Sequence, residues 1–272
     1  MRVLNEPVSW WGWHGWPDQP APLSIVQILR SGSLPPELAA LYWLALERGA
    51  SLLFAADPPG AGKTTLLTAL LAFLPEEAPV YFTRGWGETF DLPPLRDGVP
   101  TYILVNEMSD HLPVYSWGPY VQRVFELVAE GYSLGTTMHA DTVADVLQQL
   151  EGEVGVPRGH LAHLTLVSTM HVGYQGGRIV RRLNDVSLLG PGEGARGLSV
   201  SRIASWDPDR DAFAVLRSPQ QAAALAGRLG MDEGALQTEI ERRSGLLESL
   251  MREGAAGQAQ IERAVATFRR SA

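Results

Sequence analysis

The sequence predicts an α/β fold with a mainly parallel central sheet, antiparallel hairpins and a C-terminal helical unit. Short apolar runs that suit buried strands alternate with segments of helical spacing over residues 51–152. This alternation is typical of right-handed βαβ crossovers and a parallel sheet. After about residue 164, strand-like segments instead meet at Gly-rich or Pro-containing turns, and residues 218–270 then have a helical pattern.

The first part of the chain reads as an irregular arm, residues 1–22, because prolines interrupt it repeatedly. Four of the eight tryptophans of the chain lie in this arm: Trp10, Trp11, Trp13 and Trp16. General aromatic burial favours indoles that pack over the chain's own surface. Docking of the arm on a partner or on a membrane surface is the alternative.

Helices and strands follow each other through the middle of the chain. In order, we expect helices at 23–31 and 35–48, a strand at 51–56, a helix at 63–74, strands at 80–83 and 102–106, a helix at 120–131, a strand at 134–139 and a helix at 141–152. Ser33 is the expected N-cap of the second helix, and Asp141 or Thr142 that of the last.

The remaining elements are two hairpins and a helical end. The first hairpin is expected to turn at Gln175-Gly176-Gly177 and the second at Asp207-Pro208-Asp209. Beyond them the predicted helices are broken by glycines at positions 230, 234 and 254. We therefore divide the chain into a core at 23–217 and a helical subdomain at 218–272.

Composition limits what the protein can do. A chain of 272 residues with 45% hydrophobic residues has enough material for one large domain, alone or with an appendage. Its net charge of −8 lacks the basic field of a nucleic-acid binder, so nucleic acid is not an expected partner. With no cysteine, it has no disulfide, thiolate metal site or cysteine nucleophile.

Neither a membrane span nor a signal peptide is visible in the sequence. No apolar run approaches the roughly 18 residues that a spanning helix needs, and the first residues lack the apolar core of a signal peptide. We expect a cytoplasmic protein.

Residues 57–65 form a near match to the phosphate-binding loop G-x-x-x-x-G-K-[ST], between a predicted strand and a predicted helix. Gly60 and Gly62 let backbone N–H groups turn toward a phosphate. Lys63 supplies a positive charge to the β- and γ-phosphates, and the Thr64 hydroxyl suits Mg²⁺. The predicted cofactors are thus ATP and Mg²⁺, and the predicted contacts are Pro59, Gly60, Ala61, Gly62, Lys63, Thr64 and Thr65.

Asp57 departs from this motif, because it stands where the first glycine is expected. Aspartate tolerates a positive φ better than most residues, so the turn out of the strand remains feasible. Its carboxylate, however, would repel a triphosphate unless it points away. We expect nucleotide binding to persist.

Two further strand ends carry candidate catalytic residues. Glu107 follows the apolar strand in "TYILVNEMSD", where it could orient or deprotonate an attacking water. Its alternative is a surface glutamate at a strand end. His139 ends the strand in "LGTTMHAD", and a lone histidine there would more often be structural.

Together these stretches closely resemble the secretion ATPase superfamily, which comprises the type II and type IV secretion, type IV pilus and archaellum motor ATPases, here in its archaeal and tight-adherence-like branch. The resemblance covers about residues 24–270, and it includes the His-box of that family, matched by Thr137, His139 and Ala140. It implies a RecA-like P-loop core at 23–217, with His139 sensing the γ-phosphate. It also implies a hexameric ring, with a monomer or a weak, nucleotide-dependent assembly as the alternative if the interfacial arginines are missing. A membrane platform protein of a secretion or pilus machine is the implied partner, and a peripheral position at the inner face of the cell membrane is implied as well.

The chain departs from the family pattern in several places. Arg84 and Gly85 stand where the family's Asp-box has an acidic pair, and Glu88 matches only the final acid, as a candidate Mg²⁺ ligand through water. Arg84 and Arg96 are the candidates to replace the family's interfacial arginines, and Asn106 replaces the glycine before the Walker B acid. We also expect the family's separate N-terminal domain to be missing.

The sequence therefore predicts an ATP-binding, slowly hydrolysing P-loop ATPase with Lys63, Glu107 and His139 in catalytic roles. The incomplete Asp-box and the shortened arginine segment leave an alternative open: a catalytically weak nucleotide-binding module that regulates or supports a complete secretion ATPase. A DNA-transfer ATPase is disfavoured by the negative net charge.

Overall fold

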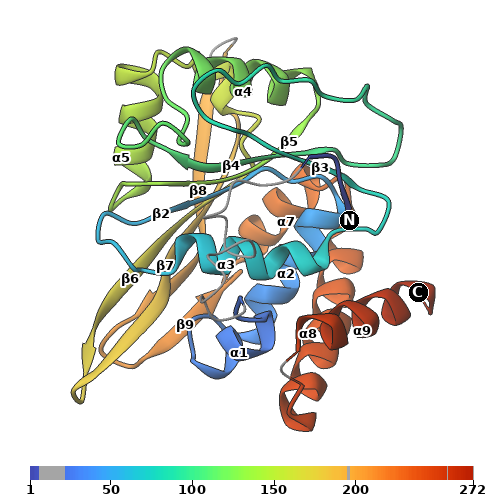
Figure 1. Ribbon diagram of the computed structural model, residues 1–272. Helices are drawn as coiled ribbons and strands as arrows, with labels where there is room; N and C mark the ends of the chain where they lie inside the picture. The colour runs from blue at the N-terminus through green and yellow to red at the C-terminus, as the bar shows by residue number, and fades with distance from the viewer. Residues whose placement is uncertain (6–21, 195–196, 256, 272) are drawn as a thin grey trace.

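The computed structural model describes residues 1–5, 22–194, 197–255 and 257–271. Within these ranges the chain forms a mixed α/β fold around a nine-stranded sheet of order β1-β3-β4-β5-β2-β6-β7-β8-β9 (Figure 1). The predicted fold class is confirmed. The four tryptophans of the N-terminal arm lie outside the described residues.

The first six strands of this order are parallel neighbours. They are β1 (Arg2–Val3), β3 (Pro79–Phe82), β4 (Tyr102–Met108), β5 (Ser133–Met138), β2 (Leu52–Ala55) and β6 (Leu166–Gln175). Every residue of β2, β3, β4 and β5 is buried, as expected for strands covered by helices on both faces. A strand at β1 was not predicted: the start of the arm pairs with β3, and Arg2 N–H donates to the Ala78 carbonyl at 2.8 Å.

The last strands are antiparallel and form the two predicted hairpins: β6 with β7 (Arg178–Pro191), and β8 (Leu198–Asp207) with β9 (Ala212–Val215). Gly176 and Gly177 both have positive φ, 55° and 77°, which is the requirement of a tight two-residue hairpin turn. In Figure 1 the β6–β7 hairpin extends beyond the body of the sheet at the lower left.

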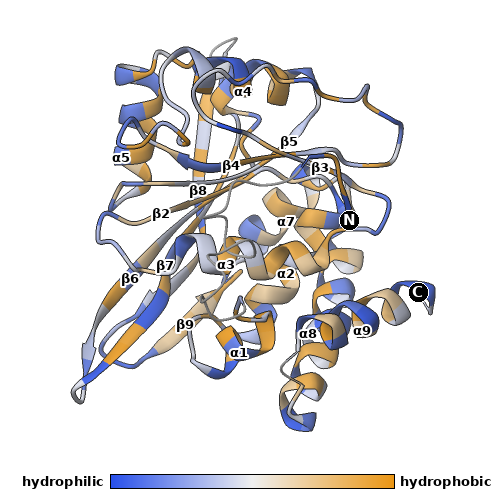
Figure 2. Cartoon of the chain, viewed as in Figure 1, coloured by the Kyte–Doolittle hydropathy of each residue, from blue (hydrophilic) through white to orange (hydrophobic). Residues whose placement is uncertain are grey.

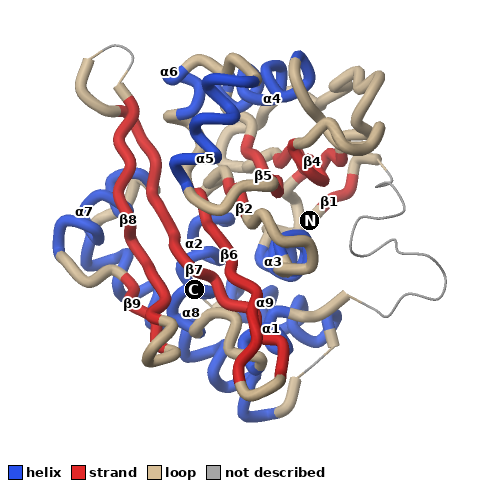
Figure 3. Tube along the Cα trace, turned by 90° about the vertical axis from the view of Figure 1, so that its left-hand side faces the viewer, coloured by secondary structure: helices blue, strands red, loops and turns tan. Residues whose placement is uncertain are grey.

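Helices cover both faces of the sheet (Figures 1 and 3). One face carries α4 (Pro119–Glu130), α5 (Val143–Gln148), which continues as a π-helical turn to Glu153, and α6 (Arg158–Leu161). The other carries α1 (Ile25–Arg30), α2 (Pro36–Glu47), α3 (Lys63–Leu70) with a 3₁₀ turn to Phe73, α7 (Pro219–Arg228), α8 (Glu233–Glu253) and α9 (Gln258–Arg270). Each set of helices closes its own apolar cluster against the sheet. Figure 2 shows the hydropathy of the helices and strands along the chain.

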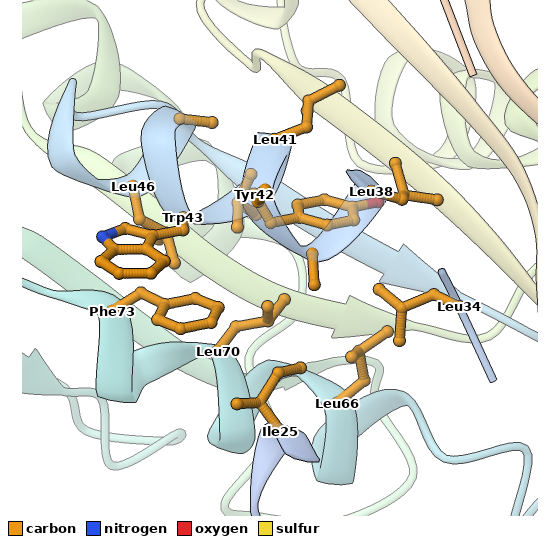
Figure 4. Close-up of a cluster of buried hydrophobic side chains, with 14 of the residues drawn as sticks. Ile25, Leu34, Leu38, Leu41, Tyr42, Trp43, Leu46, Leu66, Leu70 and Phe73 are labelled. Atoms are coloured by element: carbon orange, nitrogen blue, oxygen red, sulfur yellow. The ribbon is translucent and has the colours of Figure 1, made fainter. Parts of the chain in front are cut away.

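Helix α2 is the centre of the larger cluster (Figure 4). Residues 38–46 are all buried, so this helix is apolar on every side, as helices inside a core are. Trp43 stacks on Phe73 with ring centroids 4.8 Å apart. Ile240 of α8 and Ile261 of α9 belong to the same cluster, and the domain boundary near residue 217 stays a prediction.

The helix ends confirm one predicted cap and correct two other expectations. Pro35, not Ser33, is the N-cap residue of α2, whereas Ser24 caps α1 in a capping box. Thr142, one of the two alternatives, caps α5. Gly234 does not break a helix: the Asp232 side chain accepts a hydrogen bond from its N–H, so α8 begins around it.

No helix in the described ranges is both long and apolar enough to cross a membrane.

Candidate functional site

The order of the parallel strands brings three predicted segments together. β5 lies between β2 and β4, and the carboxyl ends of parallel strands meet at one edge of a sheet. The phosphate-binding loop follows β2, Glu107 lies near the end of β4, and His139 directly follows β5. These segments border a cavity of about 690 Å³, within the usual range of small-molecule sites.

Every predicted binding and catalytic residue of the loop lines this cavity, together with Glu107 and His139. Most of the remaining wall comes from α1 and its flanks and from the β6–β7 hairpin: Leu23, Ile28, Ser31, Ser33, Met170, Ile179, Val180 and Arg181; Leu66 of α3 and Tyr115 complete it. The cavity thus has a polar end at the loop and a more apolar end between α1 and the hairpin.

The glycines of the loop are required by its backbone. Gly60 has φ 74° and Gly62 has φ 98°, conformations that side-chain-bearing residues seldom adopt. Gly62 is also the N-cap residue of α3, and no side chain caps this helix. The N–H groups of its first turn and the positive end of its dipole therefore remain available to an anion.

Lys63 is buried at the start of α3, and its Nζ donates to the Ala56 carbonyl at 2.8 Å. Burial lowers the pKa of Lys63, while the carboxylates of Glu107 and Asp57 oppose that shift. The hydrogen-bond partner of the Lys63 ammonium is thus a neutral carbonyl oxygen. A polyphosphate bound in the cavity would give this ammonium a negatively charged partner.

Asp57 does not obstruct the loop. Its side chain is exposed and is not part of the cavity wall. The φ angle of Asp57 is not positive, so the turn out of β2 does not depend on the tolerance of aspartate for positive φ. Its main chain is used instead: the carbonyl oxygen contacts His139 Nδ1 at 2.9 Å, and the N–H lies 3.4 Å from Asp141 Oδ1.

Glu107 and His139 face each other across two neighbouring strands. Glu107 Oε1 lies 3.2 Å from His139 Nε2, and the Glu107 side chain is only 10% exposed. The β4–β5 register shifts between Val105 and Met108, an irregularity that redirects side chains at a strand end. Thr137 Oγ1 donates to the Asn106 carbonyl at 2.7 Å and ties the two strand ends together.

Glu88 is not brought to the cavity. Its carboxylate is buried in its own loop, where it accepts hydrogen bonds from Tyr81 Oη and from the N–H groups of Arg84 and Phe90, at 2.6, 2.6 and 2.8 Å. Burial and this carboxylate raise the pKa of Tyr81 to about 12. With these donors around it, Glu88 organises the loop, and its predicted role as a water-mediated Mg²⁺ ligand gains no support from its position.

The arginine at this cavity is one that the sequence did not single out. Neither Arg84 nor Arg96 lines the cavity, and their role at an interface between subunits stays a prediction. Arg181 does line it, and its Nε donates to the Gly60 carbonyl at 2.7 Å. The sequence signal was the Arg181-Arg182 pair on a strand, whose side chains must point to opposite faces. Which of the two faces the loop depends on where the hairpin lies, and local sequence does not show that.

Tyr115 is a second lining residue that the sequence did not single out. It belongs to the segment between β4 and α4. Burial and the charge of Glu107 raise its pKa, so its hydroxyl stays protonated as a hydrogen-bond donor.

The strand order, the Gly-rich loop at the end of β2 and Glu107 two strands away define a RecA-like P-loop core.

No known family model matches the chain. Two curated relatives come from Methanocaldococcus jannaschii. The uncharacterized protein MJ0900 is 26% identical over 264 residues, which cover 85% of this chain and 46% of that protein. The uncharacterized protein MJ1287 is 23% identical over 252 residues, covering 82% and 90% respectively.

The chain thus spans about half the length of MJ0900. Among solved structures, the VirB11 ATPase of the Brucella suis type IV secretion system, in complex with sulphate, aligns with TM-score 0.38 and 19% identity, covering 60% of this chain and 59% of that one. The Legionella pneumophila ATPase DotB aligns with TM-score 0.36 and 14% identity, covering 89% and 62%.

Proposed function

We propose that this chain is an ATP-binding, slowly hydrolysing P-loop ATPase of the secretion and pilus motor superfamily. The observation that carries the proposal is that one cavity gathers the glycine loop, Lys63, Glu107 and His139. Assembly into a hexamer, docking on a membrane platform protein of a secretion or pilus machine, and a cytoplasmic position at the inner face of the membrane belong to the same proposal.

The polar end of the cavity would bind the phosphates. Backbone N–H groups at Gly62 and in the first turn of α3 lack side-chain caps, and Lys63 supplies the charge. On binding, Lys63 Nζ would turn from the neutral Ala56 carbonyl to a phosphate oxygen, so that the ammonium bonds to an acceptor of opposite charge. The apolar side chains of Ile28 and Val180 would border the base.

The donors at the polar end also suit Mg²⁺. Thr64 lines the cavity one residue after Lys63, and a hydroxyl oxygen is a hard ligand of the kind that this ion prefers. When bound with the nucleotide, Mg²⁺ would neutralise part of the triphosphate charge.

Glu107 is the proposed positioning group for the attacking water. Its carboxylate would accept the water's hydrogen bond while the water oxygen bonds to the γ-phosphorus and ADP leaves with the bridging oxygen. His139 would hold Glu107 in this orientation through Nε2, and its Nδ1 ties the pair to the phosphate loop at Asp57. Gln149 Nε2 donates to the His139 carbonyl at 2.9 Å, so a displacement of the His139 main chain would also displace Gln149 at the end of α5.

Arg181 is the proposed cation for the transition state. Its guanidinium lies at the rim of the loop, bonded to the Gly60 carbonyl. Turning from that carbonyl to the γ-phosphoryl oxygens would stabilise developing charge from within the same chain, as arginines inserted from a neighbouring subunit do elsewhere. This role requires no arginine from the loop that holds Glu88.

A nucleotide-binding regulatory or structural partner of a complete secretion ATPase is the second candidate. The position of Glu88 favours it, because the carboxylate expected near Mg²⁺ is bound inside its own loop. Such a module would bind ATP through Lys63 without useful turnover.

Steady-state hydrolysis of ATP by the wild type, Lys63→Ala and Glu107→Gln separates these candidates. The ATPase proposal expects Mg²⁺-dependent turnover in the wild type that both substitutions reduce strongly. Equal background rates in all three proteins would contradict it. Saturable ATP binding combined with those equal rates would support the regulatory module.

A further inference from the structure

Three side chains with metal-binding atoms meet beside the phosphate loop: Glu107 at the end of β4, His111 in the segment that follows, and His139 after β5. One ligand atom from each lies within 4.8 Å of the other two. We propose that Glu107, His111 and His139 form a binding site for a divalent transition-metal ion of the zinc class.

The contact between His139 and Glu107 needs a positive charge between its two atoms. His139 Nδ1 lies 2.9 Å from the Asp57 carbonyl oxygen, which can only accept, so Nδ1 carries the hydrogen. In the neutral ring Nε2 then has a lone pair, and this lone pair faces a carboxylate oxygen at 3.2 Å. Two acceptors at that distance attract each other only when a proton or a metal ion lies between them.

The same atoms satisfy the geometry of a metal site. With bonds of about 2.0–2.1 Å, two ligand atoms of a tetrahedral site lie roughly 3.4 Å apart, close to the 3.2 Å observed. A ligating histidine usually donates its other N–H to a backbone carbonyl or carboxylate, which fixes the ring and its tautomer. The Asp57 carbonyl already does this for His139.

His111 completes the set with little movement. Its side chain is 66% exposed, and its ring lies 5.8 Å from that of His139, centroid to centroid. Since no ligand separation exceeds 4.8 Å, a shift of about 1.5 Å or less would bring His111 to the corner of a tetrahedron. Because the His111 side chain is exposed, this shift requires no repacking of the core.

Two imidazoles and one carboxylate favour zinc, cobalt or nickel over magnesium, which prefers oxygen ligands and keeps its waters. The site therefore differs in chemistry from the Mg²⁺ position at Thr64. An ion bound to Glu107 would withdraw that carboxylate from the attacking water and so suppress hydrolysis. Only this last consequence depends on the proposed function.

Metal binding can be measured on the full chain without nucleotide or Mg²⁺. Co²⁺ is titrated by visible absorption and Zn²⁺ by competition with a chromophoric chelator, using the wild type, His111→Ala, His139→Ala and, as a control, His163→Ala from the turn after α6. We expect one saturable site in the wild type and in His163→Ala, and an affinity at least about tenfold lower in His111→Ala and His139→Ala.

No saturable binding by the wild type, or equal affinity in the wild type and His111→Ala, would overturn the site. Thermal unfolding supplies a second readout: Zn²⁺ should raise the Tm of the wild type but not that of His111→Ala. Failure of ATP binding or hydrolysis would refute the proposed function and leave these metal measurements unaffected.

Discussion

Replacing Arg181 by glutamine tests whether the hairpin supplies the transition-state cation. Arg181 is exposed and donates from Nε to the Gly60 carbonyl, and Gln keeps a polar side chain without the charge. Because this bond is at the surface, its loss should lower the free energy of unfolding by no more than about 1 kcal/mol.

The expected effect on turnover follows from two opposing terms. An arginine that stabilises phosphoryl transfer is worth 10³–10⁵ in kcat, about 4–7 kcal/mol. Arg181 must first leave the Gly60 carbonyl, and this surface bond contributes no more than about 1 kcal/mol. The remainder is about 3–6 kcal/mol, so Arg181→Gln should lower kcat roughly 10²- to 10⁴-fold.

Coupled phosphate-release kinetics over a range of ATP concentrations would measure kcat and KM separately. The matched control is Arg178→Gln, which changes an exposed arginine on the same strand outside the cavity wall. We expect kcat to fall in Arg181→Gln with little change in KM, and neither to change in Arg178→Gln. An unchanged kcat in Arg181→Gln would refute the reasoning.

Two further predictions concern stability. Glu47 is 14% exposed and accepts hydrogen bonds from buried or half-buried arginines of α8 and α9. Because its loss would leave these arginines without their partner, Glu47→Ala should lower the free energy of unfolding, measured in urea, by about 3 kcal/mol or more. The control Glu126→Ala removes one partner of an exposed ion pair and should lower it by less than about 1 kcal/mol, so equal effects would contradict the reasoning. Asp211 accepts hydrogen bonds from the Arg182 guanidinium and from the Trp206 indole, and these bonds lower its pKa to about 2. Because the folded pKa is below the unfolded one, this stabilisation is complete above about pH 4 and is lost as the pH falls toward 2. Urea unfolding at several pH values should therefore show a steeper acid loss in the wild type than in Asp211→Asn, and parallel curves would contradict the assignment.

Much of the site could be predicted because it follows from local rules. A glycine loop between an apolar strand and a helix, and polar residues at the ends of parallel strands, must come together once the strands are neighbours. This reasoning placed Lys63, Glu107 and His139 in one cavity. The same rules predicted the turn at Gly176 and Gly177, whose positive φ values only glycine adopts readily.

The parts that sequence reasoning missed depend on contacts between distant segments. Arg181 reaches the loop only because β6 lies beside β2. Glu88 matches an acidic motif, yet the donors of its own loop capture it. Ser24 and Ser33 are equally good N-cap residues by type, and the apolar packing of α1 and α2 decides where each helix begins.

The central claim is that the loop binds nucleotide phosphates through Lys63. Isothermal titration calorimetry of ATP with Mg²⁺ into the wild type and Lys63→Ala tests it directly, independent of turnover. Lys63 is the single lysine of the chain, so the substitution removes every lysine charge at once. We predict saturable binding of one ATP per chain by the wild type and an affinity roughly 10- to 100-fold lower in Lys63→Ala, the value of one hydrogen bond from a charged donor. Absence of binding by the wild type, or equal affinities in the two proteins, would contradict the account.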